Sequence, residues 1–165
     1  MIIAEKIYVI MYSIHMITNN EVIDPLSPYG IALKKIEESG IRPTKQRRVL
    51  AKLLFQNGDR HISAENLFDE VKKEDRKISM ATIYNTLKQF TSLGLIREIV
   101  VDQNRSLYCT NNKSHYHLYI EDEGAIHDIP TKNINLDIPS FPACLALHNI
   151  DVIVRVRSQN NKKKN

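Results

Sequence analysis

The chain has 165 residues, of which 42% are hydrophobic and 25% charged, so it is long enough for one medium or two small globular domains. Its formal net charge of +4 favours a polyanionic partner only weakly. The two cysteines, Cys109 and Cys144, exclude a disulfide framework and a C-x-x-C pair, and such usage suits a reducing cytoplasm.

Residues 1–28 are expected to be an N-terminal extension with partial disorder. The stretch from Met1 to Ile17 is apolar in patches, but Glu5 and Lys6 interrupt it, and it has neither a basic start nor a small-residue cleavage site. We therefore expect neither a signal peptide nor a membrane span, and no membrane partner. Residues 18–28 are polar and turn-rich, which is typical of a linker.

Three short amphipathic helices are predicted next. The first spans Tyr29 to Ser39, the second begins at the N-cap residue Thr44 and ends before Gly58, and the third opens at Ser63. Their apolar positions recur at helical spacing and are assigned to buried faces. These positions are Ile31, Leu33 and Ile36 in the first helix, Val49, Leu50, Leu53 and Leu54 in the second, and Leu67, Phe68 and Val71 in the third.

A basic face lies on the second of these helices. Lys45, Arg48 and Lys52 are spaced i, i+3 and i+7, so they share one side of the helix. Such a run is either a solvated face or a surface that contacts phosphates, and the spacing alone leaves both interpretations open.

The segment from Ile78 to Ser92 has the pattern of a DNA-recognition helix. Ser79 is a good N-cap residue and Gly94 a good C-terminal stop. Ile83, Leu87 and Phe90 fall on one apolar face, with Leu93 after them. The opposite face is polar and has the hydrogen-bonding groups that read base edges in a major groove. It carries Thr82, Tyr84, Asn85, Lys88 and Gln89.

The sequence after Gly94 alternates in LIREIVVD and again in RSLYC, which predicts two strands joined by a tight turn. Helices followed by a hairpin give a winged helix-turn-helix order. We therefore predict an α+β protein with a winged-helix DNA-binding domain at residues 29–110. A small α/β dimerisation domain is expected at 111–158, and the polar tail 159–165 is basic.

His115 and His117 lie two residues apart in a second alternating segment. On a strand both imidazoles point to one side and can hold one metal ion. The segments LYIED and AIHDI predict a hairpin whose second strand offers the carboxylate of Asp128. The alternative is that the two histidines simply lie on a solvated strand.

Four motifs in this order, GIRPTKQRRVL, HISAENLFDEV, ISMATIYNTLKQF and GLIRE, resemble the DNA-binding domain of the ferric uptake regulator (Fur) family over Gly40 to Tyr108. The recognition helix of that family usually contains A-T-x-Y-R, and here Asn85 replaces the arginine. This departure resembles the iron response regulator (Irr) branch. The resemblance implies a homodimeric, metal- or haem-responsive transcriptional regulator that binds a double-stranded DNA operator and controls iron and haem homeostasis or peroxide-stress genes.

The resemblance also implies site residues. The DNA-binding set would be Lys45, Arg48, Lys52, Ala81, Thr82, Tyr84, Asn85 and Lys88. The ligands of a divalent iron, manganese or zinc ion would be His61, His115, His117 and Asp128. Cys109 stands where the family carries a fifth ligand, and both a ligand thiolate and a small buried residue remain open there.

Two departures concern cofactors. Ile120 and Glu123 stand where the family has a C-x-x-C pair, so we expect no Cys₄ structural zinc. Irr-type proteins commonly bind haem, but the sequence has no Cys-Pro element and Tyr116 interrupts the histidine cluster, so haem stays an alternative to metal. The competing function is a histidine-dependent metalloenzyme with a helical scaffold. We expect no enzyme, because no base oriented by a third group is evident near the histidines.

Overall fold

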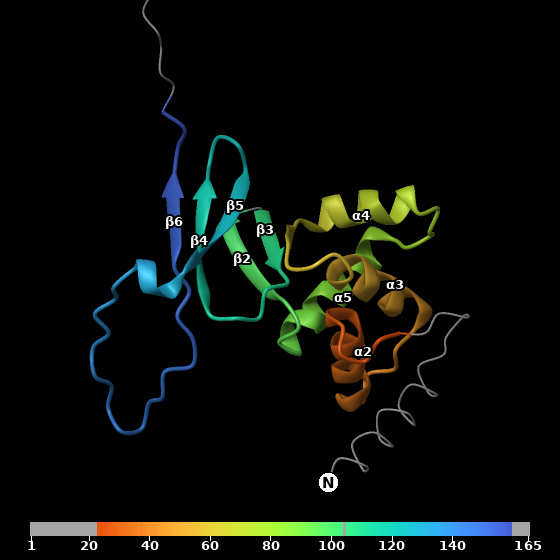
Figure 1. Ribbon diagram of the computed structural model, residues 1–165, viewed down its shortest axis with the longest axis horizontal. Coiled ribbons are helices and arrows are strands. Elements are labelled where there is room, and N and C mark those ends of the chain that lie inside the picture. The colour runs from red at the N-terminus through yellow and green to blue at the C-terminus, as the bar shows by residue number, and fades with distance from the viewer. Residues whose placement is uncertain (1–22, 104, 160–165) are drawn as a thin grey trace, which may run out of the picture. The chain divides into compact units, whose positions relative to one another are not determined.

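The computed structural model describes residues 23–103 and 105–159 (Figure 1). The chain forms two compact units, with the boundary between Asn112 and Lys113. Residues 1–22 of the expected N-terminal extension and residues 160–165 of the expected basic tail lie outside the described residues. In the part of the chain that is described, no helix has the length and apolar character needed to span a membrane.

The described residues of the first unit form four α-helices. They are α2 (Pro28–Glu38), α3 (Lys45–Phe55), α4 (Ala64–Lys73) and α5 (Met80–Ser92). Each begins at a side-chain oxygen that accepts a hydrogen bond from a backbone N–H of the first turn, which satisfies a donor that the helix leaves unpaired. These N-cap residues are Ser27, Thr44, Ser63 and Ser79. Gly94 follows α5 with φ +62°, which confirms it as the predicted stop.

The helices pack around one apolar cluster. Its largest fully buried members include Leu33, Leu54, Leu67 and Phe90, from all four helices. The prediction for Ile31 was wrong, because its side chain is 52% exposed. At about 100° per residue Ile31 lies on the side of α2 opposite Leu33, and Gly30, Ala32, Leu33 and Ile36 form the buried face instead.

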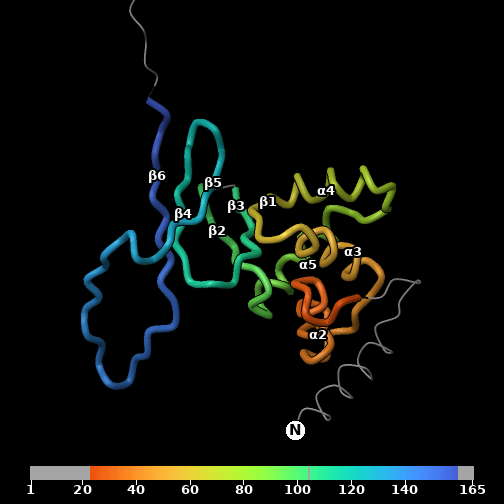
Figure 2. Tube along the Cα trace, viewed as in Figure 1, coloured from red at the N-terminus to blue at the C-terminus, as the bar shows by residue number. Residues whose placement is uncertain are grey.

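A three-stranded antiparallel sheet completes the first unit in the order β1-β3-β2. The predicted hairpin is formed by β2 (Arg97–Asp102) and β3 (Arg105–Cys109). The sequence did not indicate β1 (His61–Ile62), which pairs with β3 and is labelled beside it in Figure 2. Two residues are too few to show an alternating pattern.

The second unit is a sheet with the order β5-β4-β6. The hairpin of β4 (His115–Ile120) and β5 (Ala125–Pro130) is antiparallel, as predicted, and β6 (Ile153–Val156) lies parallel to β4. The chain between β5 and β6 contains the 3₁₀ turn η1 (Thr131–Asn133). The described residues of this unit include no α-helix, so the expected α/β character of the unit is wrong there. Pro139 and Pro142 interrupt the stretch in which a helix would have to form.

Candidate metal ligands and DNA-binding surface

His115 and His117 lie on the same face of β4. The strand alternates between buried and half-buried residues, and these two side chains are on its buried face, with residue exposures of 6% and 3%. Their Nε2 atoms are 2.9 Å apart and the rings meet edge to face. This burial contradicts the solvated-strand alternative.

A backbone carbonyl next to His115 favours one tautomer of its ring. Its Nδ1 atom is 2.7 Å from the carbonyl oxygen of Lys113, which only accepts hydrogen bonds. A neutral His115 therefore donates from Nδ1 and directs the lone pair of Nε2 toward His117. A ring oriented in this way is the usual arrangement for a metal-binding histidine, because the carbonyl holds the tautomer that leaves Nε2 available.

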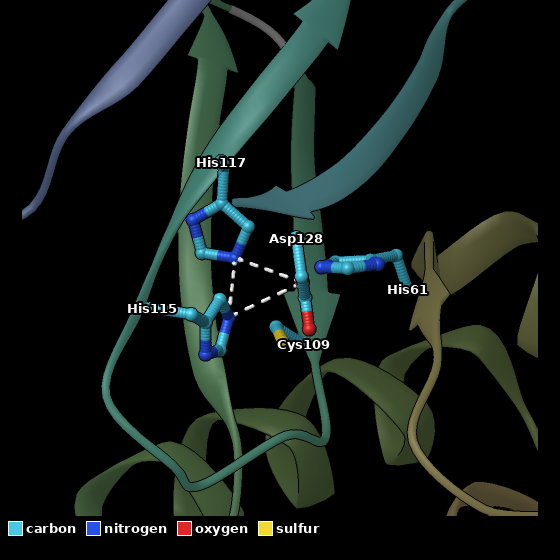
Figure 3. A group of neighbouring side chains, drawn as sticks. All are labelled: His61, Cys109, His115, His117 and Asp128. Atoms are coloured by element: carbon cyan, nitrogen blue, oxygen red, sulfur yellow. Dashed lines mark hydrogen bonds and ion pairs between the residues drawn. The ribbon is translucent and has the colours of Figure 1, made fainter. Parts of the chain in front are cut away.

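Asp128 adds a carboxylate to the two imidazoles (Figure 3). It is the register partner of His117 on β5. Its Oδ1 atom is 3.3 Å from Nε2 of His115 and 3.9 Å from Nε2 of His117. The second unit thus brings together one ligand atom from each of these three predicted residues, all within 4.8 Å of one another. Two imidazoles and a carboxylate fit a divalent cation of borderline softness.

His61 and Cys109 form a second pair, within the first unit. They are register partners on β1 and β3, and one ligand atom of each lies within 4.8 Å of the other. Hydrogen bonds next to this pair hold β1 in place, because Arg60 N–H donates to the hydroxyl of Thr110 over 2.8 Å and Thr110 N–H donates to the carbonyl of Arg60 over 3.0 Å. Cys109 is fully buried. An imidazole and a thiol therefore face the same side of this small sheet.

The outward face of α5 carries the predicted base-reading residues. Ala81, Tyr84, Asn85 and Lys88 are exposed, and Thr82 is half-buried. Asn85 and Lys88 also line a groove of about 570 Å³ that reaches the N-terminal turn of α3. Polar side chains in a groove beside an exposed helix face can form hydrogen bonds to the base edges or the phosphates of DNA.

The three predicted phosphate contacts differ in their surroundings. Lys45 is exposed and Lys52 is half-buried. Arg48 is already engaged, because its Nη2 atom is 3.5 Å from Oε1 of Glu37 and its Nε donates to the carbonyl of Pro43 over 3.1 Å. These contacts link the Arg48 side chain to α2 and to the segment before α3.

Arg47 is a residue that the sequence analysis missed. Its Nε donates to Oε1 of Gln89 over 2.8 Å, and it lines the groove beside α5. It lies about 100° around α3 from Arg48, a turn that brings it to the α5 side. A cation three residues after the N-cap Thr44 was the available signal, but only the packing of α3 on α5 shows which cation faces the groove.

Glu65 was also missed. The hydroxyl of Tyr84 donates to Oε1 of Glu65 over 2.6 Å. That hydrogen bond is the main cause that lowers the pKa of Glu65 and raises the pKa of Tyr84. A residue of α4 is thereby linked to the predicted reading face of α5.

The sequence of this chain is similar to that of known proteins over residues of both units. The sequence model of the Ferric uptake regulator family matches residues 38–152. The peroxide-responsive repressor PerR of Staphylococcus aureus (strain Mu50) is 29% identical over 104 residues, which cover 63% of this chain and 70% of that protein.

Two solved structures share the fold. The ferric uptake regulator from Pseudomonas aeruginosa with manganese has a TM-score of 0.61 at 18% identity, over 78% of this chain and 98% of that one. A zinc-bound manganese uptake regulator has a TM-score of 0.56 at 28% identity, over 76% and 98% respectively.

Proposed function

Because the chain belongs to the Ferric uptake regulator family, we propose that it is a transcriptional regulator whose affinity for DNA depends on a bound divalent metal ion. The observation that carries this proposal is the convergence of Nε2 of His115, Nε2 of His117 and Oδ1 of Asp128 on the second unit. Two buried imidazoles whose ring nitrogens face each other need a proton or a cation between them, since two lone pairs repel.

We propose that one ion takes ligands from both units. His115, His117 and Asp128 would come from the second unit, and His61 and Cys109 from the first. A donor set of nitrogen, oxygen and sulfur suits Fe(II), Zn(II) or Mn(II), and affinity alone would follow the general order of divalent metals. The relatives described as bound to manganese and to zinc support this class of ion.

The bound cation would act by linkage. An ion that binds one arrangement of the two units better than another must change DNA affinity by the same coupling free energy that DNA exerts on the ion, typically ~1–3 kcal/mol. His115 and His117 hold the ion on the second unit, while His61 connects it to the unit that carries α5. Residues 111–158 would then be the sensing and dimerisation domain and residues 29–110 the winged-helix DNA-binding domain.

The DNA contacts would be divided between two helices. We propose that the exposed face of α5 reads base edges through Ala81, Thr82, Tyr84, Asn85 and Lys88. Cations of α3 would contact phosphates, with Lys45 and Lys52 as predicted and Arg47 added by its place in the groove. Two copies of the chain would place two α5 helices on half-sites about one helical turn apart.

The response within the family is the finer part of the proposal. Asn85 in place of the usual arginine and the residues Ile120 and Glu123 in place of paired cysteines favour an Irr-like response to iron or haem. The S. aureus relative is described as peroxide-responsive, which favours control of peroxide-stress genes. An absorption spectrum of the protein titrated with haem tests the first of these responses. A regulator that responds to haem develops a saturable Soret band at one haem per chain, and one that does not bind haem shows no such band. We do not adopt the metalloenzyme alternative, because these relatives are described as a repressor and as uptake regulators.

The decisive test removes both imidazoles of β4. The double variant His115→Ala with His117→Ala should lose the one-metal-per-chain stoichiometry and the effect of metal on affinity for a DNA site selected from a random library. His127→Ala is the matched control, because His127 is an exposed histidine on the neighbouring strand of the same hairpin. If the double variant keeps one metal per chain and an unchanged response while the control behaves identically, the sensing site lies elsewhere.

A further inference from the structure

Tyr84 is held at its hydroxyl by a residue outside α5. Its side chain leaves the outward face of the helix, and the residue is 46% exposed. Its hydroxyl is 2.6 Å from Oε1 of Glu65, an exposed residue in the first turn of α4. A hydrogen bond from a phenol to a carboxylate is short and stronger than one between neutral groups.

The protonation states at neutral pH make this bond one-directional. The hydrogen bond from Tyr84 lowers the pKa of the Glu65 carboxyl, and the charge of Arg105 acts in the same direction. The hydrogen bond to Glu65 raises the pKa of Tyr84. The carboxylate is therefore charged and the phenol keeps its proton. Since a phenol has a single O–H donor, Tyr84 has none left for a base or a phosphate while the bond is intact.

The side chain of Tyr84 has open space beside it. A cavity of about 430 Å³ lies beside Tyr84, and its lining residues come from α4, α5 and both strands of the hairpin. They are Ala64, Glu65, Tyr84, Glu98, Arg105, Ser106 and Tyr108. A half-exposed aromatic side chain beside an open space can adopt more than one rotamer. In the observed rotamer the hydroxyl is held by the hydrogen bond to Glu65.

We infer that Glu65 is a positioning residue of the DNA interface, which holds Tyr84 so that it reads DNA with the carbon atoms of its ring and not with its hydroxyl. This inference rests on the proposed function. Glu65 also has an unfavourable effect on DNA affinity. The charge of its exposed carboxylate next to α5 repels phosphates and weakens binding to every DNA sequence alike. Glu65 thus raises specificity while it lowers non-specific affinity.

The test compares two substitutions that remove the same charge. Glu65→Gln keeps an oxygen that accepts from Tyr84, whereas Glu65→Ala does not. Both variants should bind random DNA more tightly than the wild type by the same factor. Only Glu65→Ala should lower the ratio of affinities for selected over random DNA, by about three- to tenfold, which corresponds to one hydrogen bond. Glu98→Ala is the matched control: this exposed carboxylate lines the same cavity, and its removal should leave the ratio unchanged.

Tyr84→Phe completes the cycle. It removes the hydroxyl and leaves the ring, so it should lower the ratio as much as Glu65→Ala does, and the double variant should lose no more than either single one. Additive losses, or a Glu65→Ala variant with the wild-type ratio, would overturn the inference.

A measurement without DNA separates this inference from the proposed function. The ¹³Cζ resonance of Tyr84 in the full chain should titrate at higher pH in the wild type than in Glu65→Ala. If the two titrate alike, the bond does not exist in solution and the inference is wrong, whatever DNA does. If they differ but no DNA sequence is selected by the wild type, the proposed function fails and the positioning role fails with it.

Discussion

The two units bury different kinds of side chain. In the first unit the buried cluster is made of apolar residues such as Leu33, Leu54 and Phe90. In the second unit the described residues that are buried are His115, His117 and Tyr119, all on one face of β4. Apolar burial stabilises a fold at roughly 25 cal/mol per Å² without any ligand. Buried imidazoles are stabilising only when they have partners.

This difference indicates that the two units are stabilised in different ways. We expect the first unit to fold by itself, because its apolar cluster includes residues from all four of its described helices. The second unit has a small sheet and also leaves large apolar side chains exposed, between 39% and 61%, in the segment that joins β5 to β6. These are Leu136, Ile138, Phe141, Leu145 and Leu147. We propose that a bound ion and a second copy of the chain supply the stabilisation that its own core does not.

The largest expected effect comes from separating the units. A fragment that ends at Asn112 keeps the whole apolar cluster, so its helical circular dichroism and cooperative unfolding should persist. It should be monomeric by light scattering, and its affinity for a two-half-site DNA should fall by roughly 10²–10⁴-fold, because the second contact is no longer intramolecular. A fragment that still dimerises would place the dimer interface in the first unit.

The second prediction concerns metal and stability. Zinc at about 100 times its dissociation constant should stabilise the second unit by ~2.7 kcal/mol. Hydrogen exchange read by mass spectrometry should show more added protection in β4 and β5, which carry three of the proposed ligands, than in α2, which carries none. The variant with His115→Ala and His117→Ala should show no gain in either region. Equal protection of α2 would mean that the two units unfold as one.

The features that could be predicted from the sequence are local ones. The N-cap residues Thr44, Ser63 and Ser79 could be predicted because each hydroxyl accepts a hydrogen bond from the backbone N–H three residues later. Such a contact depends only on residues that are close in the sequence. The two hairpins and the shared face of His115 and His117 follow from alternation along single strands.

The features that the sequence missed depend on packing between distant segments. Strand β1 exists because β3 pairs with it, and two residues carry no period of their own. The bonds of Arg47 to Gln89 and of Tyr84 to Glu65 join residues 42 and 19 positions apart. Arg48 has the spacing of a phosphate contact, yet Glu37 of α2 takes up its charge. The spacing of residues along one helix shows which face of the helix a side chain occupies, but not which side chain of another segment it contacts.

The third prediction separates base reading from phosphate contact within the first unit. Asn85→Ala should cost roughly 1–3 kcal/mol on the selected DNA site and little on random DNA. Lys45→Ala should weaken both about equally and reduce the salt slope by about one. Arg48→Ala should leave that slope unchanged, because its guanidinium is held by Glu37 and Pro43. Equal losses on both DNAs for Asn85→Ala would remove its base-reading role.

The smallest expected effect is a pH dependence of the stability of the first unit. The folded state lowers the pKa of Glu65, chiefly through the hydrogen bond from Tyr84 and with help from the charge of Arg105. Its stabilising contribution is therefore fully present above the ordinary glutamate pKa of about 4.3 and is lost as the pH falls through the lowered value. The folded state raises the pKa of Tyr84. The stabilisation from the same hydrogen bond therefore persists up to the ordinary tyrosine pKa of about 10 and is lost as the pH rises through the raised pKa.

Urea unfolding of Glu65→Gln, followed by helical circular dichroism, should show a shallower acid dependence of the unfolding free energy than the wild type. The alkaline limb contains Tyr108 as well, whose pKa is raised to about 12, first by burial and then by the charge of Glu98. That limb should therefore remain in Glu65→Gln, and its disappearance would show that the bond to Glu65 accounts for the whole alkaline dependence.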